Sequence, residues 1–411
     1  MTDTSTAEES SKYDEEDRIS ALPDVILHHV LGFLWADEAV HTCLLARRWR
    51  YLWKSMRCIL VYDKGWWRKS THVFLNKFMD CVLLLRDPGS TLDEVHIEYD
   101  HLEDDHTWID LWIDIWIRHA LSCQAQVLTV RLSYEVDFCL DGPPVVSRHL
   151  RRLELSDVTL KGNFMNFSSC SSLEELYIED CYLETGRILS QSLKHLTIKG
   201  CFSRNDGRIR VTVPNLVSLQ LLSFRGRTPL FESMPSLETA VVEPNNYLED
   251  YCCKGVALEC CGICADCCGN DDHNGNCVLL GGLSHAKSLE LTAYPGMLIF
   301  RRDLRWCPTF SKLKTLLLNE WCVQPDLRAL VCMLEHSLVL ENLTLQLCEQ
   351  GKPTGAVEAE ENHSLMEKPA AISGYLKIMK VKCEDIDGRV CKVLKFLIIL
   401  GMDIIIQRID G

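Results

Sequence analysis

The segments "LEELYI" (residues 173–178) and "LKHLTI" (residues 193–198) repeat one apolar pattern, Leu-x-x-Leu-x-Leu, at a distance of 20 residues. The same pattern or a close variant begins at 11 places: residues 92, 127, 150, 173, 193, 216, 237, 286, 313, 340 and 376. The five consecutive intervals from 127 to 237 are 23, 23, 20, 23 and 21 residues. Chance can produce one or two such matches but not a series of this length, so the chain contains an internal repeat.

A period of this length is typical of leucine-rich repeats, in which each unit supplies one strand and buries its apolar side against its neighbours. We therefore predict an α/β fold with a leucine-rich-repeat solenoid, or horseshoe, over residues 92–350. Residues two apart in a strand point to the same side, so pairs such as Leu196 and Ile198 are expected to face the core. The residues between them are expected to line an exposed sheet that binds a partner protein: Arg152, Glu154, Glu175, Tyr177, His195, Thr197, Gln220, Glu290, Thr315 and Asn342.

Composition and charge narrow the class of protein. The 411 residues include 22 cysteines and carry a formal net charge of -15, which opposes binding to nucleic-acid phosphates. Residues 1–17 contain seven acidic residues and one lysine, so we expect a disordered acidic tail and no export signal. The longest apolar stretch, residues 393–402, is too short for a membrane span. We therefore expect a protein of a reducing compartment with no nucleic-acid or membrane partner.

Residues 18–57 predict three short helices. The first, from about Pro23 to Leu34, has apolar residues on nearly all sides, so more than one of its faces must be buried. The second begins near Asp37, and the third carries an apolar stripe that includes Trp49 and Trp53 at helical spacing. Some 40 residues rarely form a stable domain alone, so these helices either dock on a partner or pack on the rest of the chain.

The sequence "DRISALPDVILHHVLGFL…AVHTCLLARRWRYLW" resembles the F-box of plant F-box proteins. It departs from the usual family pattern at Trp35-Ala36 and at Ala46-Arg47. In that family the F-box binds the Skp-type adaptor of a cullin-RING ubiquitin ligase. The resemblance implies that the following residues face the adaptor or form the small core beneath it: Leu22, Pro23, Ile26, Leu27, Val30, Leu31, Leu34, Val40, Leu44, Trp49 and Trp53.

A cysteine-rich insertion interrupts the repeats. The interval from 237 to 286 is 49 residues, which leaves roughly 26 extra residues after one normal period of about 23, and they correspond to residues 250–277. Cys261, Cys264 and Cys267 form a C-x2-C-x2-C run that could bind zinc or iron–sulfur, but the second knuckle of a structural zinc site is absent. We expect an unliganded surface insertion and no cofactor, with metal binding or disulfides as the alternatives.

The remaining segments complete the predicted organisation. Residues 58–91 are expected to be a linker or helical region, and residues 351–370 an acidic loop. Residues 371–411 read as strand, helix and strand, which would cap the solenoid, and this segment is similar to the FBD tail of many plant F-box and leucine-rich-repeat proteins.

These features predict a non-catalytic substrate receptor of an SCF-type cullin-RING ubiquitin ligase, located in the cytoplasm, the nucleus or both. Its F-box would dock on the Skp-type adaptor, and its repeats would hold an unidentified target protein. Two alternatives remain open. One is a cysteine-rich metal-binding or redox protein on a repeat scaffold, and the other is a repeat scaffold outside any ligase.

Overall fold

The computed structural model describes residues 19, 21–62, 71–99, 109–133, 138–205, 207–248, 250, 277–294, 297–323, 327–347, 374–399 and 403–409. The predicted acidic tail, the acidic loop, and the cysteine-rich insertion apart from its two end residues lie outside these ranges. No helix among the described residues combines the length and the apolar character needed to cross a membrane.

A short helical segment comes first in the chain. It consists of α1 (Asp24–Leu31), α2 (Ala36–His41), η1 (Thr42–Leu44) and η2 (Arg47–Ser55). The third helix was predicted as an α-helix, and η2 is instead a 3-10 helix. The prediction relied on a stripe of large apolar residues, and Trp49, Leu52 and Trp53 are all buried, so the stripe identified the buried face without fixing the helix type.

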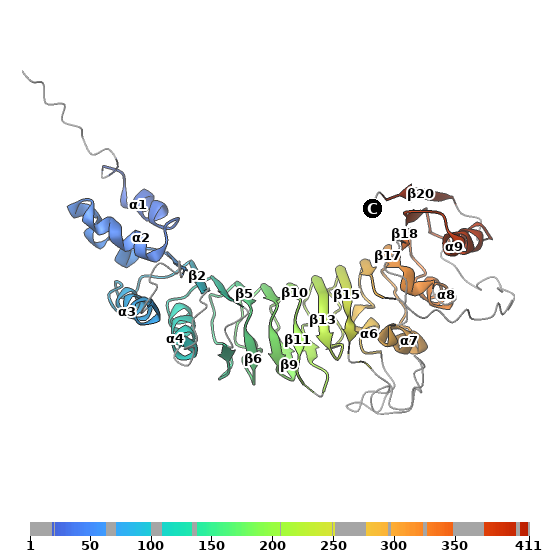
Figure 1. Cartoon of the computed structure of the whole chain (residues 1–411), viewed down its shortest axis with the longest axis horizontal. Coiled ribbons are helices and arrows are strands. Elements are labelled where there is room, and N and C mark those ends of the chain that lie inside the picture. The colour runs from blue at the N-terminus through green and yellow to red at the C-terminus, as the bar shows by residue number, and fades with distance from the viewer. Residues whose placement is uncertain are drawn as a thin grey trace, which may run out of the picture.

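Within the described ranges, thirteen strands form one parallel ladder in chain order, and Figure 1 shows the ladder along the inner side of the arc. Parallel strands that follow one another in this way are the arrangement expected of a leucine-rich-repeat solenoid. The strands are β1 (Cys58–Tyr62), β2 (Glu94–Tyr99), β3 (Val127–Leu132), β5 (Arg152–Ser156), β7 (Glu175–Glu179), β10 (His195–Lys199), β13 (Ser218–Gly226), β15 (Thr239–Leu248), β16 (Ser288–Leu291), β17 (Thr315–Asn319), β18 (Asn342–Leu347), β19 (Ile378–Cys383) and β20 (Ile404–Arg408).

Short strands and helices connect the ladder strands on the outer side of the arc (Figure 1). Between residues 139 and 231 the connecting strands pair in parallel with their equivalents in the next repeat, so these middle repeats are held together by more than the ladder alone. These elements are α3 (Thr71–Leu84), α4 (Ile109–Ser122), β4 (Cys139–Leu140), β6 (Thr159–Lys161), β8 (Tyr182–Glu184), β9 (Arg187–Leu189), β11 (Phe202–Ser203), β12 (Arg210–Thr212), β14 (Leu230–Phe231), α6 (Leu280–Leu283), α7 (Leu298–Asp303), η3 (Leu304–Trp306), η4 (Glu320–Cys322) and α8 (Arg328–Glu335).

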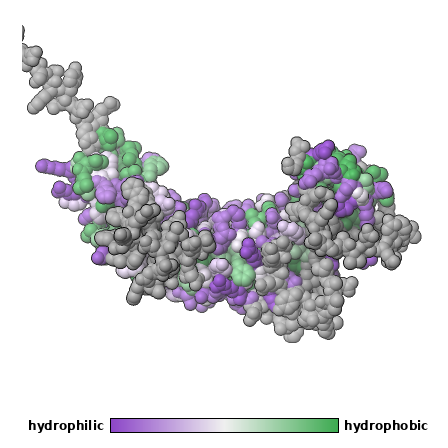
Figure 2. Space-filling view, in the orientation of Figure 1, coloured by the Kyte–Doolittle hydropathy of each residue, from purple (hydrophilic) through white to green (hydrophobic). Residues whose placement is uncertain are grey.

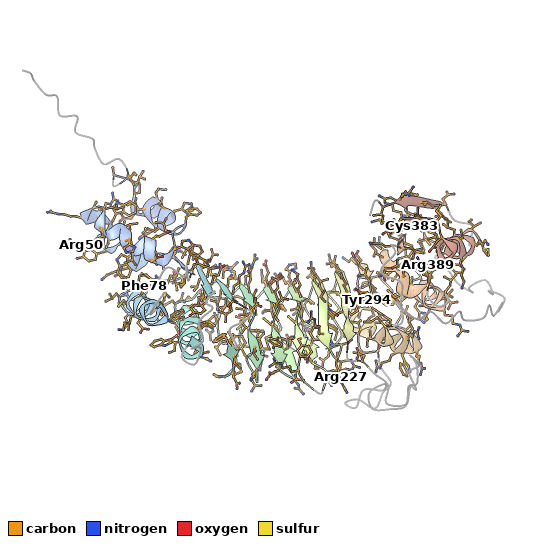
Figure 3. The ribbon with its side chains drawn as sticks, viewed as in Figure 1. Arg50, Phe78, Arg227, Tyr294, Cys383 and Arg389 are labelled. Carbon is orange, nitrogen blue, oxygen red and sulfur yellow. The ribbon has the colours of Figure 1, made fainter. Side chains whose placement is uncertain are left out.

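Alternation along each strand builds the core. In β7 and β10 the side chains of Leu176, Ile178, Leu196 and Ile198 are at most 2% exposed, while the residues between them reach the surface. Figure 3 shows side chains standing on both faces of the ladder along its length. Full burial of one such side chain contributes about 1.5–3 kcal/mol, and each repeat adds two or more to the same continuous core.

The sheet begins earlier than the sequence pattern predicted. Residues 58–91 were expected to be a linker or helical region, but β1 pairs with β2 over its whole length and α3 follows it. The strand register also corrects the start of one repeat. Val127 lies opposite Arg152, so the residue opposite position 150, where the next repeat begins, is residue 125. The repeat assigned to residue 127 therefore begins two residues earlier. Strand β1 escaped detection because its three pattern positions hold Met56, Ile59 and Val61 and none of them is leucine.

A left-handed residue follows the same ladder position in four repeats, where it ends β5, β7 and β10 and lies at a register shift within β13. Asp157, Asp180, Gly200 and Ser223 each follow the same ladder position and have φ values of 57°, 51°, 64° and 52°. In this conformation the Gly200 amide donates to the Leu222 carbonyl at 2.9 Å, and Asp180 donates to Lys199 at 2.8 Å. Aspartate and glycine tolerate positive φ better than most residues, which explains their use at this turn.

The chain ends in β19, α9 (Gly388–Ile399) and β20, the predicted order of strand, helix and strand. Asp387 accepts a hydrogen bond from the Val390 amide at 2.8 Å, the contact that starts this helix. Four side chains of α9 are buried: Val390, Val393, Phe396 and Leu397.

Candidate functional site: two interaction surfaces

The N-terminal helical segment exposes large apolar side chains. Val25, Phe33, Leu44 and Leu45 are 77%, 73%, 80% and 73% exposed. Figure 2 shows apolar surface over these helices. We call the exposed set the N-terminal apolar residues: Leu22, Val25, Ile26, Val30, Phe33, Leu44 and Leu45. Exposed apolar groups gathered on so small a segment are typical of a protein–protein interface.

The eleven residues that the F-box resemblance selected separate into three groups by burial. Leu22, Pro23, Ile26, Val30 and Leu44 are exposed, and Leu34 and Val40 are partly buried. The other four, Leu27, Leu31, Trp49 and Trp53, form the core of the segment. The structure thus divides the set into possible contact residues and supporting residues. Sequence reasoning did not select Val25, Phe33 and Leu45, although the apolar residues all around the first predicted helix were a signal for Val25 and Phe33.

Polar contacts fix the helices to one another. Arg48 pairs with Asp24 at 2.7 Å, and the Ser55 hydroxyl lies 3.0 Å from His28 Nε2, so η2 is tied to α1 at two points. These contacts hold the short helices around the Leu27 side chain, which has no solvent exposure. The exposed apolar residues of α1 therefore sit on a defined support.

The helical segment also packs onto the first strands of the sheet. Trp35 lies against Tyr62 of β1 and His96 of β2, with ring centroids 5.3 and 6.4 Å apart. Two polar contacts join the same regions, because Arg86 Nη1 donates to the Met56 carbonyl at 2.9 Å and the Asp87 amide donates to the Lys54 carbonyl at 3.1 Å. Trp35, where the chain departs from the family pattern, thus contacts the solenoid.

The outward residues of the ladder form rows that run across the strands. Register places Arg152, Glu175, His195 and Ser218 in one row, which continues through Ser288, Thr315 and Asn342. A second row contains Glu154, Tyr177, Thr197, Gln220 and Glu290. The ten predicted substrate-binding residues therefore belong to one continuous surface, which lines the concave side of the arc (Figure 1).

Glu154 corrects the expectation that every such residue is exposed. Its side chain is only 10% exposed, since it lies between Arg131 at 3.4 Å and Arg152, whose Nε donates to Glu154 Oε1 at 2.6 Å. Arg152 also reaches Glu175 at 3.5 Å. A carboxylate held by two guanidinium groups is compensated, and it orients both arginines on the surface. Glu154 therefore supports this surface from a mostly buried position.

A third row, which sequence reasoning missed, extends the charged region. Glu179 accepts hydrogen bonds from Lys199 Nζ at 2.5 Å and from the Tyr177 hydroxyl at 2.8 Å. The bond from Lys199, and then that from Tyr177, lowers the pKa of Glu179 below its ordinary value. Burial is the main reason that the pKa of Tyr177 is raised, and the hydrogen bond to Glu179 is the second. Glu179 and Lys199 lie one residue beyond the repeat consensus, which gave no signal for them.

The concave surface changes character along the solenoid. From β5 to β10 the first two rows are charged or aromatic at most positions, whereas from β13 to β18 they are mostly small and uncharged. Glu290 is the one charged residue among the outward positions of the second part, which are Ser218, Gln220, Thr239, Val241, Ser288, Glu290, Thr315, Leu317, Asn342 and Thr344. A partner could form ion pairs with the first part of the surface, whereas the second part offers contacts to small, uncharged side chains.

The cysteine run Cys261, Cys264 and Cys267 lies outside the described residues, so that alternative stays a prediction. Cys277, at the end of the insertion, is 8% exposed and donates to the Trp306 carbonyl at 2.7 Å and the Asp303 carbonyl at 3.3 Å. Burial, and to a lesser degree Asp303, raises the pKa of Cys277 to about 12. The Cys277 thiol therefore stabilises the structure by donating hydrogen bonds, and it holds the chain in place just before α6.

Comparison with known proteins finds plant proteins that are similar to much of this chain. No family model matches the chain. A rice protein (Oryza sativa subsp. japonica) named MEIOTIC F-BOX protein MOF is 29% identical over 377 residues, which cover 81% of this chain and 72% of the rice protein.

Two relatives from Arabidopsis thaliana carry the segment names themselves. An F-box/FBD/LRR-repeat protein is 29% identical over 49% of this chain, and an FBD-associated F-box protein is 28% identical over 51% of it. The chain spans about half the length of these two relatives, 46% and 54%. Together with the parallel ladder and the exposed helical segment, these matches make the chain a homologue of plant F-box proteins with leucine-rich repeats and an FBD segment.

Proposed function

We propose that this protein is the substrate-recognition subunit of an SCF-type cullin-RING ubiquitin ligase. Its N-terminal apolar residues would dock on a Skp-type adaptor, and its concave sheet would hold a target protein. The proposal rests above all on the exposure of Val25, Phe33, Leu44 and Leu45 on a segment built on its own small core. F-box proteins as a class act as receptors without doing bond chemistry, and the names of the relatives support the same role here.

The packing of the N-terminal helical segment on the sheet suggests how the protein would work as a receptor. Trp35 packs on Tyr62 and His96, so the adaptor-facing helices and the target-facing sheet are joined without a linker between η2 and β1. A target held on the sheet would stay at a defined distance from the ligase, which raises the effective concentration of its lysines near the ubiquitin-conjugating enzyme. Under this proposal the protein works in the cytoplasm, the nucleus or both.

The C-terminal segment would close the solenoid. Phe396 and Leu397 of α9 are 3% and 0% exposed, so the helix covers apolar groups at the end of the ladder. Capping of this kind is what a solenoid needs at its last repeat. We propose that the FBD-like segment has this structural role.

Binding of the full chain to a purified Skp-type adaptor tests the proposal. The double variant Leu22→Ala with Pro23→Ala removes two exposed groups of the N-terminal helical segment, and we expect adaptor capture to be lost. The matched control is Ile405→Ala with Ile406→Ala, which removes side chains that are 51% and 48% exposed on β20, at the other end of the ladder. Equal capture by both variants would contradict the docking model.

A further inference from the structure

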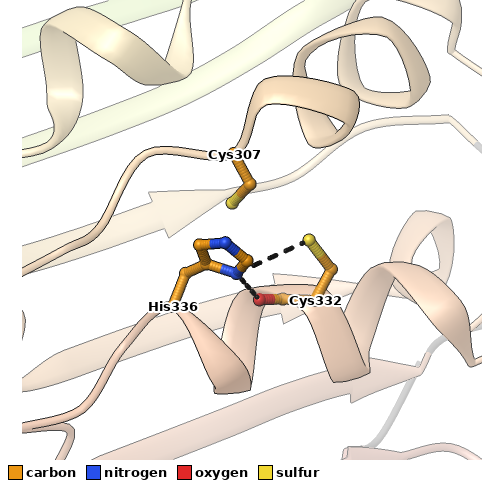
Figure 4. Close-up of side chains that lie close together, drawn as sticks. All are labelled: Cys307, Cys332 and His336. Atoms are coloured by element: carbon orange, nitrogen blue, oxygen red, sulfur yellow. Dashed lines mark hydrogen bonds between the residues drawn. The ribbon is translucent and has the colours of Figure 1, made fainter.

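Three potential metal ligands meet outside both interaction surfaces. Cys307 follows η3, Cys332 lies in α8 and His336 ends that helix. One ligand atom from each lies within 4.8 Å of the other two, and no other such group of three or more occurs among the described residues. Figure 4 shows the two thiols and the imidazole ring converging from these two connecting segments.

The fold brings the group together in two steps. Cys332 and His336 are four residues apart, so one helical turn places them on the same side of α8. Packing between successive repeats then adds Cys307, since the Cys332 thiol lies 3.7 Å from the Leu304 carbonyl and the Phe310 amide donates to the His336 carbonyl at 2.8 Å. These backbone contacts lie on either side of Cys307 in the sequence.

The imidazole of His336 is oriented as metal-binding histidines usually are. Its Nδ1 lies 2.8 Å from the Cys332 carbonyl oxygen. A carbonyl can only accept, so Nδ1 carries the proton and Nε2 keeps its lone pair. Figure 4 shows this second nitrogen on the side of the ring toward Cys307. A hydrogen bond from the non-ligating nitrogen to a backbone carbonyl is the common way in which proteins fix a metal-binding imidazole.

We propose that Cys307, Cys332 and His336 bind one zinc ion. Two thiolates and an imidazole suit zinc better than calcium or magnesium, which prefer oxygen ligands. Around a tetrahedral zinc the ligand atoms stand about 3.5–3.8 Å apart, so atoms that now lie within 4.8 Å of one another need to approach by about 1.3 Å at most. Water or an added ligand would take the fourth position.

The ion would act as a clip between two repeats. Cys307 precedes β17, while Cys332 and His336 precede β18, so zinc would join the connecting segments of neighbouring ladder strands. Binding would release the two thiol protons to solvent, with no oxidation or reduction. All three side chains are partly buried, which leaves an entry path for the ion.

Metal analysis of the full chain tests the site. The protein is purified under reductant, exposed to zinc, dialysed into metal-free buffer and analysed by mass spectrometry for metals. We expect the double variant Cys307→Ser with Cys332→Ser to hold one zinc ion fewer per chain than the unmodified protein. The triple variant Cys261→Ser, Cys264→Ser, Cys267→Ser, which removes the sequence-predicted run, should keep that ion.

A matched control comes from α4. His119 and Cys123 have the same spacing of four residues, and His119 Nε2 lies 3.4 Å from Cys123 Sγ, but they belong to no group of three ligands within the described ranges. His119→Asn with Cys123→Ser should leave the zinc content unchanged. Equal zinc content in this variant and in the Cys307/Cys332 variant would overturn the proposal, as would an unmodified protein that holds no zinc.

Cobalt substitution gives an independent readout if the double variant does not fold. Cobalt bound by thiolates absorbs strongly in the near ultraviolet through sulfur-to-metal charge transfer. The single variants Cys307→Ser and His336→Asn should each weaken cobalt affinity more than tenfold, and only the first should reduce the charge-transfer band at saturation. Unchanged cobalt affinity in both, or a stable Cys307–Cys332 disulfide in protein kept under reductant, would overturn the site.

Discussion

In the solenoid, Leu196 and Ile198 are 1% and 0% exposed, whereas in the N-terminal helices Val25 and Phe33 are 77% and 73% exposed. Both regions are rich in large apolar residues, yet they use them differently. A solenoid strand buries one face against its own repeat and its neighbours, so its leucines are satisfied within the chain. The helical segment leaves several of its apolar side chains exposed within the described ranges, and this exposure is what the proposed docking on a partner would cover.

The difference in burial predicts a difference in what substitutions do. Loss of an inward solenoid residue should reduce stability, while loss of an outward helical residue should reduce binding alone. The four predictions below test this contrast, from the largest expected effect to the smallest.

The largest effect is expected in the solenoid core. Leu196→Asp removes a buried side chain, which costs about 2–5 kcal/mol for the missing volume, and adds the cost of an unpaired buried carboxylate. We expect loss of the cooperative thermal transition and of soluble protein. Circular dichroism during heating measures this. Thr197→Asp, at the adjacent outward position, is the control, and equal melting of the two variants would show that the inward row does not carry the fold.

Substitutions within α1 should separate binding from stability. Val25→Ser changes an exposed side chain, so we expect the free energy of unfolding to change by less than about 0.5 kcal/mol. As a central contact, Val25 should contribute about 2 kcal/mol to adaptor binding, so we expect the affinity to fall roughly 30-fold. Leu27→Ala, two residues on, removes a fully buried side chain and should cost about 2–5 kcal/mol of stability. Calorimetric titration with the adaptor and thermal melting measure both effects. The reverse pattern, with Val25→Ser unstable and still binding, would contradict the assignment of faces.

Trp35 should affect the junction of the two regions. Trp35→Ala removes the ring contact with Tyr62 and His96, which is worth about 0.5–1.5 kcal/mol beyond the area it covers. We expect faster amide exchange in β1 and adaptor affinity within about threefold of the unmodified protein, since Trp35 faces the sheet. Trp35→Phe retains a ring and should restore most of the protection. Unaltered exchange in Trp35→Ala would mean that the junction does not depend on this side chain.

The smallest effect concerns charge at a strand end. Partial burial, followed by the negative charges of Asp180 and Glu179, raises the pKa of Asp157 to about 6 from 3.8. A folded-state pKa above the unfolded value means that the native protein binds the proton more tightly. Asp157 therefore lowers stability as pH rises through about 6, and this cost disappears as pH falls toward 4.

Asp157→Asn removes the charge and keeps a residue that tolerates the left-handed φ of 57°. Because Asp157 is only partly buried, solvent screening limits the gain to well below the value that the full pKa shift would give. We expect a melting temperature about 1 °C higher at pH 7.5 and no difference near pH 4. An equal gain at both pH values would point to a cause other than charge.

Sequence periodicity predicted much of the fold because strand alternation and repeat length are local properties. The leucine pattern predicted the inward positions of β7, β10 and β17 and the outward rows between them. It missed β1, where Met56, Ile59 and Val61 occupy the three pattern positions, because detection depended on finding leucine in at least one of them. The resemblance to the F-box identified which helices matter, while periodicity alone left their partner open.

The sequence by itself determined that the chain forms a parallel repeat array. It also determined that the first helices carry more apolar residues than they can bury. Both properties follow from the spacing of residues that are close in the chain. Only the tertiary structure decided which of those apolar residues point outward, that Glu154 is enclosed by Arg131 and Arg152, and that Cys307 meets His336. The physical reason is that each of these features depends on how one segment packs against another. The stacking of repeats and helices sets that packing, and spacing within a segment does not encode it.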